Sequence, residues 1–360
     1  MEQHQDTMAM LDLIIQPAFC VNNGVIVHVN KAAAGILLEE GCPVASLLVT
    51  GHAEYSEFKE GCLYLTLQHS GGTYGASVVR MSGFDVFVLE DESDHAELKA
   101  MALAAQNLRE PLSSVMTVAN TLQTTVENAT DPTVSDQMAR LNRGLFQMLR
   151  ILGNMSDADR YRTNTLSPKE TKDIQAFLGE LFERLSVMTG HAHIALCFTN
   201  LDDSLYCLID TEKLERAIYN VVSNAMKFTP KGGNIEAQLI RRENRLYLTI
   251  QDSGTGIPEN QRANVYSRFL RQPGLDDSRQ GIGLGMVLIR SAATAHGGTV
   301  LIEQPKGQGL RLTMTMTIQQ HRDGLIRSPG LQVDYAGEWD HSLIELSESL
   351  PASVYTEKTK

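Results

Sequence analysis

Three short stretches in the second half of the chain combine residue types that could hold a nucleotide. The first is an expected helix over residues 211–228, in which Asn220, Asn224 and Lys227 stand at i, i+4 and i+7 and so share one face. Amide oxygens are hard neutral ligands that suit a Mg²⁺ ion already held by triphosphate oxygens, and the lysine supplies a positive charge for phosphate. Taken alone, such a stripe is more often a solvated helix face.

The second stretch follows an expected strand over residues 245–251 and is an Asp-Ser-Gly-Thr-Gly sequence that begins at Asp252. An ionised aspartate only accepts hydrogen bonds, so it can pair with the amino group of adenine but not with the carbonyl that guanine has there. Gly254 and Gly256 would let the backbone approach a ligand closely. Taken alone, this sequence is more often a simple turn.

The third stretch is a Gly-Ile-Gly-Leu-Gly run that contains Gly281, Gly283, Leu284 and Gly285 and leads into an expected helix over residues 285–295. Glycine-rich backbone at a helix N-terminus presents free N–H groups and the positive end of the helix dipole to phosphate. A lone run of this kind is weak evidence.

In this order and spacing, the three stretches resemble the N, G1 and G2 boxes of the histidine kinase catalytic domain. Residues 265–271 resemble the intervening F box, and the polar residues 272–280 resemble the mobile lid over ATP. The resemblance implies Mg²⁺ and ATP as cofactors, with Asn224 as the magnesium-binding residue, Asp252 on adenine, and the five glycines and Leu284 around the nucleotide. The catalytic residues that it implies are Asn220, Lys227, Arg268 and Arg271.

Asn220 separates this chain from the gyrase-type ATPases, which resemble the same fold. Those enzymes place a glutamate, the base that activates water, where Asn220 stands. A neutral amide cannot take that proton, so efficient ATP hydrolysis is disfavoured. Transfer of the phosphoryl group to a side chain, or nucleotide binding alone, remains open.

The phosphoacceptor position departs from the family pattern. The segment from Gln106 to Leu112 matches the family's acceptor motif at four positions, and Gln106 stands where the acceptor histidine is expected. An amide nitrogen is delocalised into its carbonyl and is a poor nucleophile, whereas neutral imidazole has a free lone pair. His95 lies three helical turns earlier and is a possible substitute acceptor, although a surface histidine without a role is the commoner case.

The elements around these residues indicate a multidomain α+β protein. Short strands and glycine turns over residues 1–93, including the hairpin signal Asn22-Asn23-Gly24, resemble a PAS sensor domain. Residues 94–163 carry two heptad seams that predict a helical hairpin, which two chains would pair into a four-helix bundle. A monomeric hairpin packed on a neighbouring domain is the alternative.

Beyond the hairpin, helices and strands alternate over residues 168–320, which predicts an α/β sandwich ATP-binding domain of the gyrase and histidine kinase type. The tail over residues 321–360 contains an amphipathic helix whose apolar stripe is formed by Trp339, Leu343, Leu346 and Leu350. Docking of this stripe on the chain's own catalytic domain is favoured over a partner site, because large apolar stripes rarely stay exposed.

The net charge, the cysteine spacing and the hydropathy of the chain exclude several classes of partner, metal site and location. The net charge of −12 disfavours nucleic acid and anionic lipid as partners, and five widely spaced cysteines without a Cys-x-x-Cys pair indicate neither a zinc site nor a disulfide framework. Since no apolar stretch is long enough to span a membrane and the first residues do not read as a signal peptide, we expect a cytoplasmic protein.

These observations favour a dimeric sensor histidine kinase homologue that binds Mg-ATP and acts in two-component signal transduction, with a response regulator or partner kinase as its output. Phosphorylation at the usual position is not expected, because Gln106 occupies it. The alternative is a catalytically degenerate pseudokinase, a regulatory ATP-binding scaffold for a partner kinase or response regulator.

Overall fold

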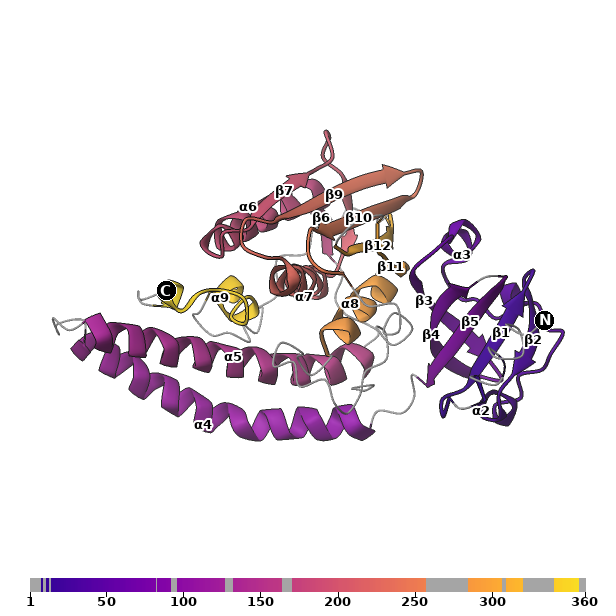
Figure 1. The fold of residues 1–360 in the computed structure, drawn as a ribbon, viewed down its shortest axis with the longest axis horizontal. Helices are drawn as coiled ribbons and strands as arrows, with labels where there is room; N and C mark the ends of the chain where they lie inside the picture. The colour runs from indigo at the N-terminus through magenta and orange to yellow at the C-terminus, as the bar shows by residue number, and fades with distance from the viewer. Residues whose placement is uncertain are drawn as a thin grey trace.

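The computed structural model describes most of the chain as four consecutive parts (Figure 1). A five-stranded sheet, a long helical hairpin, an α/β unit and a short C-terminal segment follow one another. The described residues are 8, 11–12, 14–81, 83–91, 96–126, 132–163, 170–256, 284–305, 309–319 and 340–355.

The N-terminal part is an antiparallel sheet with strand order β2-β1-β5-β4-β3. Its strands are β1 (Ala18–Asn22), β2 (Val25–Val29), β3 (Cys62–His69), β4 (Gly72–Met81) and β5 (Phe84–Asp91), and its short helices are α2 (Lys31–Gly35), η1 (Val44–Ser46) and α3 (His52–Glu57). Asn23 and Gly24 both have positive φ angles, 49° and 78°, as the tight turn between two paired strands requires. The hairpin predicted at Asn22-Asn23-Gly24 is therefore confirmed, whereas the PAS-like assignment stays a prediction.

The hairpin consists of α4 (Ala96–Val126) and α5 (Pro132–Thr163), which run side by side (Figure 1). Its apolar seams divide into two sets. Ala105, Leu112 and Ala119 of α4 are buried within the hairpin. Leu108, Val115 and Leu122, spaced seven residues apart, remain 54%, 51% and 49% exposed in the single chain. The hairpin therefore leaves a second apolar stripe uncovered.

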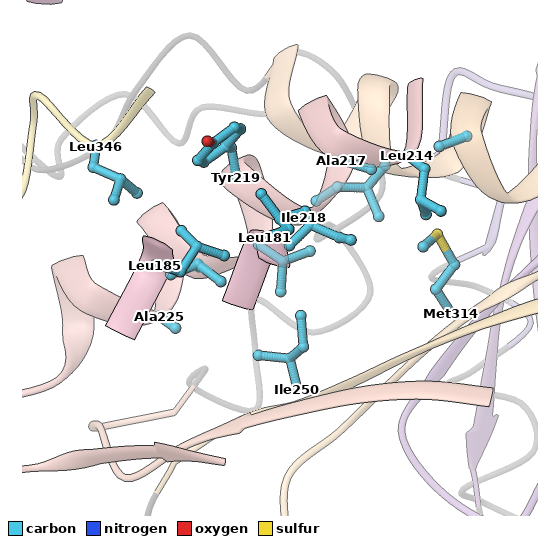
Figure 2. Close-up of a cluster of buried hydrophobic side chains, with 14 of the residues drawn as sticks. Leu181, Leu185, Leu214, Ala217, Ile218, Tyr219, Ala225, Ile250, Met314 and Leu346 are labelled. Atoms are coloured by element: carbon cyan, nitrogen blue, oxygen red, sulfur yellow. The ribbon is translucent and has the colours of Figure 1, made fainter. Parts of the chain in front are cut away.

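The α/β unit packs its helices on one mixed sheet. The strands are ordered β11-β12-β10-β9-β7, and β7 and β9 form a parallel pair. The bounds are α6 (Ile174–His191), α7 (Thr211–Phe228), α8 (Leu284–Ala295), β7 (Ala195–Thr199), β9 (Asn234–Arg242), β10 (Arg245–Asp252), β11 (Val300–Glu303) and β12 (Arg311–Thr317). Figure 2 shows how Leu181 and Leu185 of α6 and Ile218 of α7 meet Ile250 and Met314 of the sheet. Burial of these side chains fixes α7 over the strand that ends in Asp252.

A second, two-stranded sheet was not predicted from the sequence. It pairs β6 (Glu170–Asp173) with β8 (Tyr206–Ile209) in antiparallel register. Asp173, the last residue of β6, accepts a hydrogen bond from the backbone N–H of Gln175 and thereby caps α6. The small sheet thus leads the chain into the first helix of the α/β unit.

The N-terminal sheet and the α/β sheet join edge to edge into one ten-stranded sheet. The junction pairs β3 with β11, with Leu63 opposite Leu301. Gly61, at φ 97°, lies so close to this junction that a Cβ atom there would collide with the carbonyl oxygen of Ile302. An ion pair between Arg290 and Glu90, 3.0 Å apart, also crosses from one unit to the other.

The C-terminal segment, residues 340–355, lies between α5 on one side and α6 and α7 on the other (Figure 1), and we call it the strap. It contains α9 (His341–Glu345) and η3 (Ala352–Tyr355). Leu343, Leu346 and Leu350 are at most 1% exposed, so most of the predicted apolar stripe docks on the chain itself. Trp339 lies outside the described residues. Among the described helices, none combines the length and apolar character that a bilayer crossing requires.

Candidate nucleotide-binding site

Helix α7 presents the three polar residues at the heart of the predicted site. The helix begins at Asp210, whose side chain caps it by accepting a hydrogen bond from the backbone N–H of Lys213. Asn220 is buried, Asn224 is exposed, and the side chain of Lys227 is 12% exposed. This single helix face therefore runs from the protein interior to the surface.

The turn after β10 holds Asp252 in a fixed orientation. The backbone N–H groups of Gly254 and Leu310 donate to Oδ1 of Asp252 at 2.8 Å and 3.3 Å. Both hydrogen bonds fall on Oδ1, and within the described part of the chain no residue hydrogen-bonds to Oδ2, so Oδ2 is available for a ligand. Burial raises the pKa of this carboxyl above its ordinary value, although the backbone hydrogen bonds act in the opposite direction.

The same turn lies directly against the C-terminal end of α7. A Cβ atom at Gly254 would lie 2.5 Å from the carbonyl oxygen of Phe228, so no larger residue fits without movement of the backbone. Phe228 is the residue after Lys227. The acidic glycine turn and the amide-bearing helix are therefore neighbours.

The start of α8 approaches α7 one helical turn away from Asn224. A Cβ atom at Gly285 would lie 2.9 Å from Oδ1 of Asn220, while Nδ2 of Asn220 donates to the carbonyl oxygen of Arg216 at 2.8 Å. The amide oxygen of Asn220 thus points at the first turn of α8. All three predicted elements consequently meet around one helix, α7.

His296 ties the far end of α8 back to the start of α7. The backbone N–H of Asp210 donates to Nε2 of His296 at 3.0 Å, and Nδ1 donates to the carbonyl oxygen of Ala292 at 2.7 Å. The accepting role of Nε2 requires the neutral tautomer that carries its proton on Nδ1. His296 directly follows the last residue of α8, and nothing near it in the sequence signals its bond to Asp210.

Not every predicted site residue lies in the described part of the chain. Arg268, Arg271, Gly281, Gly283 and His95 fall outside it, as do the segments predicted as the F box and the lid. Leu284 is described and is buried.

Gly256 does not face α7 as its neighbour Gly254 does. A Cβ atom at Gly256 would instead lie 2.5 Å from the side chain of Gln304 and 3.0 Å from the carbonyl oxygen of Gly309. These residues precede β12. Gly256 therefore shapes the turn against the neighbouring strand.

The donor set suits a magnesium nucleotide better than a metal ion alone. Among the described residues, no three His, Cys, Asp or Glu side chains gather into a group that could hold a metal ion. Magnesium usually takes few protein ligands and several oxygens from phosphate or water. The exposed amide of Asn224 and the open Oδ2 of Asp252 are groups of the kind that such a ligand needs.

The predicted acceptor position lies on the hairpin near this site. Leu284, at the start of α8, belongs to a small buried cluster against which Met101 of α4 and Met155 of α5 pack. Gln106 follows Met101 by five residues, or about 7.5 Å along the helix, and its side chain is exposed. The first turn of α8 therefore lies beside the part of α4 that contains Gln106.

One charged contact at the site was missed by sequence reasoning. Glu348 of the strap pairs with Lys227, with 3.4 Å between Oε2 and Nζ. The two residues are 121 positions apart, so no local pattern could reveal the pair.

Comparison with known proteins identifies the kind of domain. Residues 209–320 match the family described as histidine kinase-, DNA gyrase B- and HSP90-like ATPase. The sensor histidine kinase WalK of Bacillus subtilis is 28% identical over 195 residues, which cover 52% of this chain and 30% of WalK. The adaptive-response sensory kinase SasA of Synechococcus is 26% identical over 232 residues, or 61% of this chain and 59% of SasA. The chain thus matches less than two thirds of the length of either relative.

A solved structure supports the fold. Full-length ShkA in complex with AMPPNP is 19% identical and superposes with a TM-score of 0.50, over 69% of this chain and 54% of ShkA. Together with the sequence matches, this similarity agrees with the meeting of α7, the Asp252 turn and α8. The chain carries an ATP-binding domain of the histidine kinase family.

Proposed function

We propose that the protein is a dimeric sensor histidine kinase homologue that binds Mg-ATP and acts in two-component signal transduction. The observation that carries this proposal is the convergence of the Asp252 turn and the start of α8 on α7. The polar groups that we assign to adenine, magnesium and phosphate lie close together around this helix.

Each polar residue has a distinct proposed role. Oδ2 of Asp252 accepts a hydrogen bond from the adenine amino group, and Asn224 supplies an amide oxygen to magnesium. Lys227 balances phosphate charge, and Asn220, whose amide oxygen lies against the first turn of α8, contacts phosphate or metal beside it. Bound Mg-ATP would supply an activated phosphoryl group, and these residues would orient it and stabilise its charge, as phosphoryl transfer generally requires.

The exposed stripe on the hairpin supports a dimer. Leu108, Val115 and Leu122 stand at heptad spacing on α4, and Leu141 and Met148 repeat that spacing on α5. An uncovered apolar seam of this kind suits a second copy of the same hairpin, because a twofold axis presents the same stripe on both sides. The predicted four-helix bundle would result.

Incubation with Mg-ATP labelled on the γ-phosphate separates the enzyme from a regulatory module. We expect the wild-type protein to bind ATP without becoming labelled at residue 106, because an amide is a poor nucleophile. In the histidine kinase motif an acidic residue follows the acceptor histidine and helps to activate it, and Asn107 stands in its place here. The variant Gln106→His with Asn107→Glu restores both the imidazole and this acidic neighbour. Acid-labile label in this variant alone would show that the nucleotide site is competent for transfer.

Two controls define the remaining outcomes. Label in the wild type that disappears in His95→Ala would identify a displaced acceptor and an active kinase. Steady release of phosphate would indicate a gyrase-like ATPase, which Asn220 argues against. Absence of ATP binding in every variant would refute the proposal.

The second candidate function is a regulatory scaffold in which ATP binding sets the conformation and a partner kinase or response regulator gives the output. The exposed Gln106 and Asn107 on α4 favour it, because both chemical parts of the usual acceptor site are replaced. Tight ATP binding with no label, even after Gln106→His and Asn107→Glu, would support this function over the first.

A further inference from the structure

The strap is held by both the hairpin and the ATP-binding domain. From α5, Arg143 donates to the carbonyl oxygens of Ser347 and Glu348 at 3.1 Å and 2.8 Å. From the opposite side, the hydroxyl of Ser349 donates to the carbonyl oxygen of Ser223 in α7 at 3.3 Å. The three residues from Ser347 to Ser349 therefore bridge α5 and α7.

Glu348 lies between one cation of each helix. Its Oε2 is 2.9 Å from the guanidinium of Arg150 in α5 and 3.4 Å from the ammonium of Lys227 in α7. Burial alone would raise the pKa of Glu348, but the charges of Arg150 and Lys227 outweigh it and hold the pKa below its ordinary value. The carboxylate is therefore negatively charged at neutral pH.

The strap and the proposed nucleotide face occupy adjacent sectors of α7. Successive residues of an α-helix are rotated by about 100°. Relative to Lys227, Asn224 points about 60° to one side, and Ser223, which contacts the strap, points about 40° to the other. Lys227 stands on the boundary and belongs to both surfaces.

We propose that the strap and the triphosphate of the nucleotide compete for Lys227. While the strap is in place, the ammonium of Lys227 pairs with the carboxylate of Glu348. Bound nucleotide would instead pair this ammonium with its phosphate oxygens. The two anions repel each other across a partly buried site, where screening by salt is weak. Nucleotide binding therefore loosens the central Ser347–Ser349 segment of the strap and with it the bridge to α5.

Buried residues hold the strap on both sides of this segment, so the segment can loosen without release of the whole strap. The buried hydroxyl oxygens of Ser223 and Ser347 have no hydrogen-bond partner among the residues that the structure describes, which weakens the seat locally. Leu343, Leu346 and Leu350, in contrast, are at most 1% exposed, and Figure 2 shows Leu346 in the same cluster of buried side chains as Tyr219 of α7. The apolar residues anchor the strap, and the charged residues respond to the ligand.

The inference rests on the proposed ATP binding, and AMPPNP with Mg²⁺ is the probe for both. Glu348→Gln removes the competing charge and nearly keeps the shape of the side chain. The free energy of a partly exposed ion pair corresponds to a few-fold change in binding affinity. We therefore expect Glu348→Gln to bind AMPPNP about 2- to 5-fold more tightly than wild type. Asp136→Asn, at an exposed ion pair on α5, makes the same charge change away from the site and should bind like wild type.

Hydrogen exchange of the unmodified protein gives an independent reading. Linkage requires that nucleotide loosens the strap by the same factor by which the strap weakens nucleotide. Saturating AMPPNP should therefore accelerate amide exchange of residues 347–349 by about 2- to 5-fold.

The outcomes distinguish the inference from the function on which it rests. Equal or weaker binding by Glu348→Gln, or unchanged exchange in the strap of a protein that binds AMPPNP, would overturn the competition and leave ATP binding intact. Failure of wild type and Glu348→Gln alike to bind would refute both proposals.

Discussion

Replacement of Asp252 by asparagine tests whether this residue recognises adenine in the proposed nucleotide site. The carboxylate uses Oδ1 to accept hydrogen bonds from the backbone N–H groups of Gly254 and Leu310, and asparagine can keep both with its own amide oxygen. What changes is the second position, where the acceptor Oδ2 becomes an NH₂ donor. That donor would face the amino group of adenine, which is also a donor.

The size of the effect follows from the hydrogen bond that is lost. A hydrogen bond to a charged acceptor contributes about 1.5–3 kcal/mol, so AMPPNP should bind Asp252→Asn about 10- to 150-fold more weakly than wild type. The guanine carbonyl accepts hydrogen bonds, so the ratio of GTP to ATP affinity should rise in the variant. Calorimetric titration with the ATP and GTP analogues measures both quantities.

Stability should change in the opposite direction. Because burial raises the native pKa of Asp252, the folded protein holds a proton there at pH values where the unfolded chain has lost it. The contribution of this residue to stability is therefore lost as pH rises from the unfolded pKa through the raised folded pKa, and it stays unfavourable at neutral pH. Asp252→Asn removes that penalty, so its Tm at pH 7 should equal or exceed that of wild type.

Two results would refute this reasoning. Unchanged AMPPNP affinity in Asp252→Asn would mean that Asp252 does not contact adenine. A Tm at pH 7 well below that of wild type would mean that the ionised carboxylate stabilises the fold, contrary to its burial and raised pKa.

Three further substitutions probe other parts of the molecule. Gly254→Ala should cost about 1–3 kcal/mol in urea unfolding and abolish AMPPNP binding, because its Cβ atom would press on the backbone of α7; wild-type binding would contradict the close approach. Glu345→Gln should cost about 3 kcal/mol, since it leaves the buried cation Arg216 without one of its carboxylates; a loss below 1 kcal/mol would show that the charge of Glu345 adds little net stability. Val115→Glu should convert the proposed dimer to a monomer in light scattering, whereas Thr117→Glu, on the opposite face of α4, should not; a dimer in both variants would exclude the exposed stripe as the interface.

Regular periodicity made most of the α/β unit predictable from sequence. Helix α7 was expected over residues 211–228 and has those bounds, because apolar and polar faces alternate along it without interruption. β6 was missed because its four residues, Glu170 to Asp173, are polar and carry no alternation. Short edge strands of this kind are specified by their neighbours rather than by their own residues.

The candidate site divides in the same way. Asn220, Asn224 and Asp252 belong to local motifs, so the sequence alone indicates them. Contacts across long separations in the chain left no such signal, as with Lys227 and Glu348, or His296 and Asp210. Their partners become apparent only after the strap and the two helices have packed.

The pairing of β3 with β11 has a mechanical consequence. Two sheet edges that would otherwise attract strands of foreign chains cover each other. Rotation of the N-terminal sheet against the ATP-binding domain would also have to break main-chain hydrogen bonds between residues 62–64 and residues 300–302. Any movement of the first ninety residues would thus strain the sheet that carries Asp252 through a shared backbone ladder, without first passing along the hairpin.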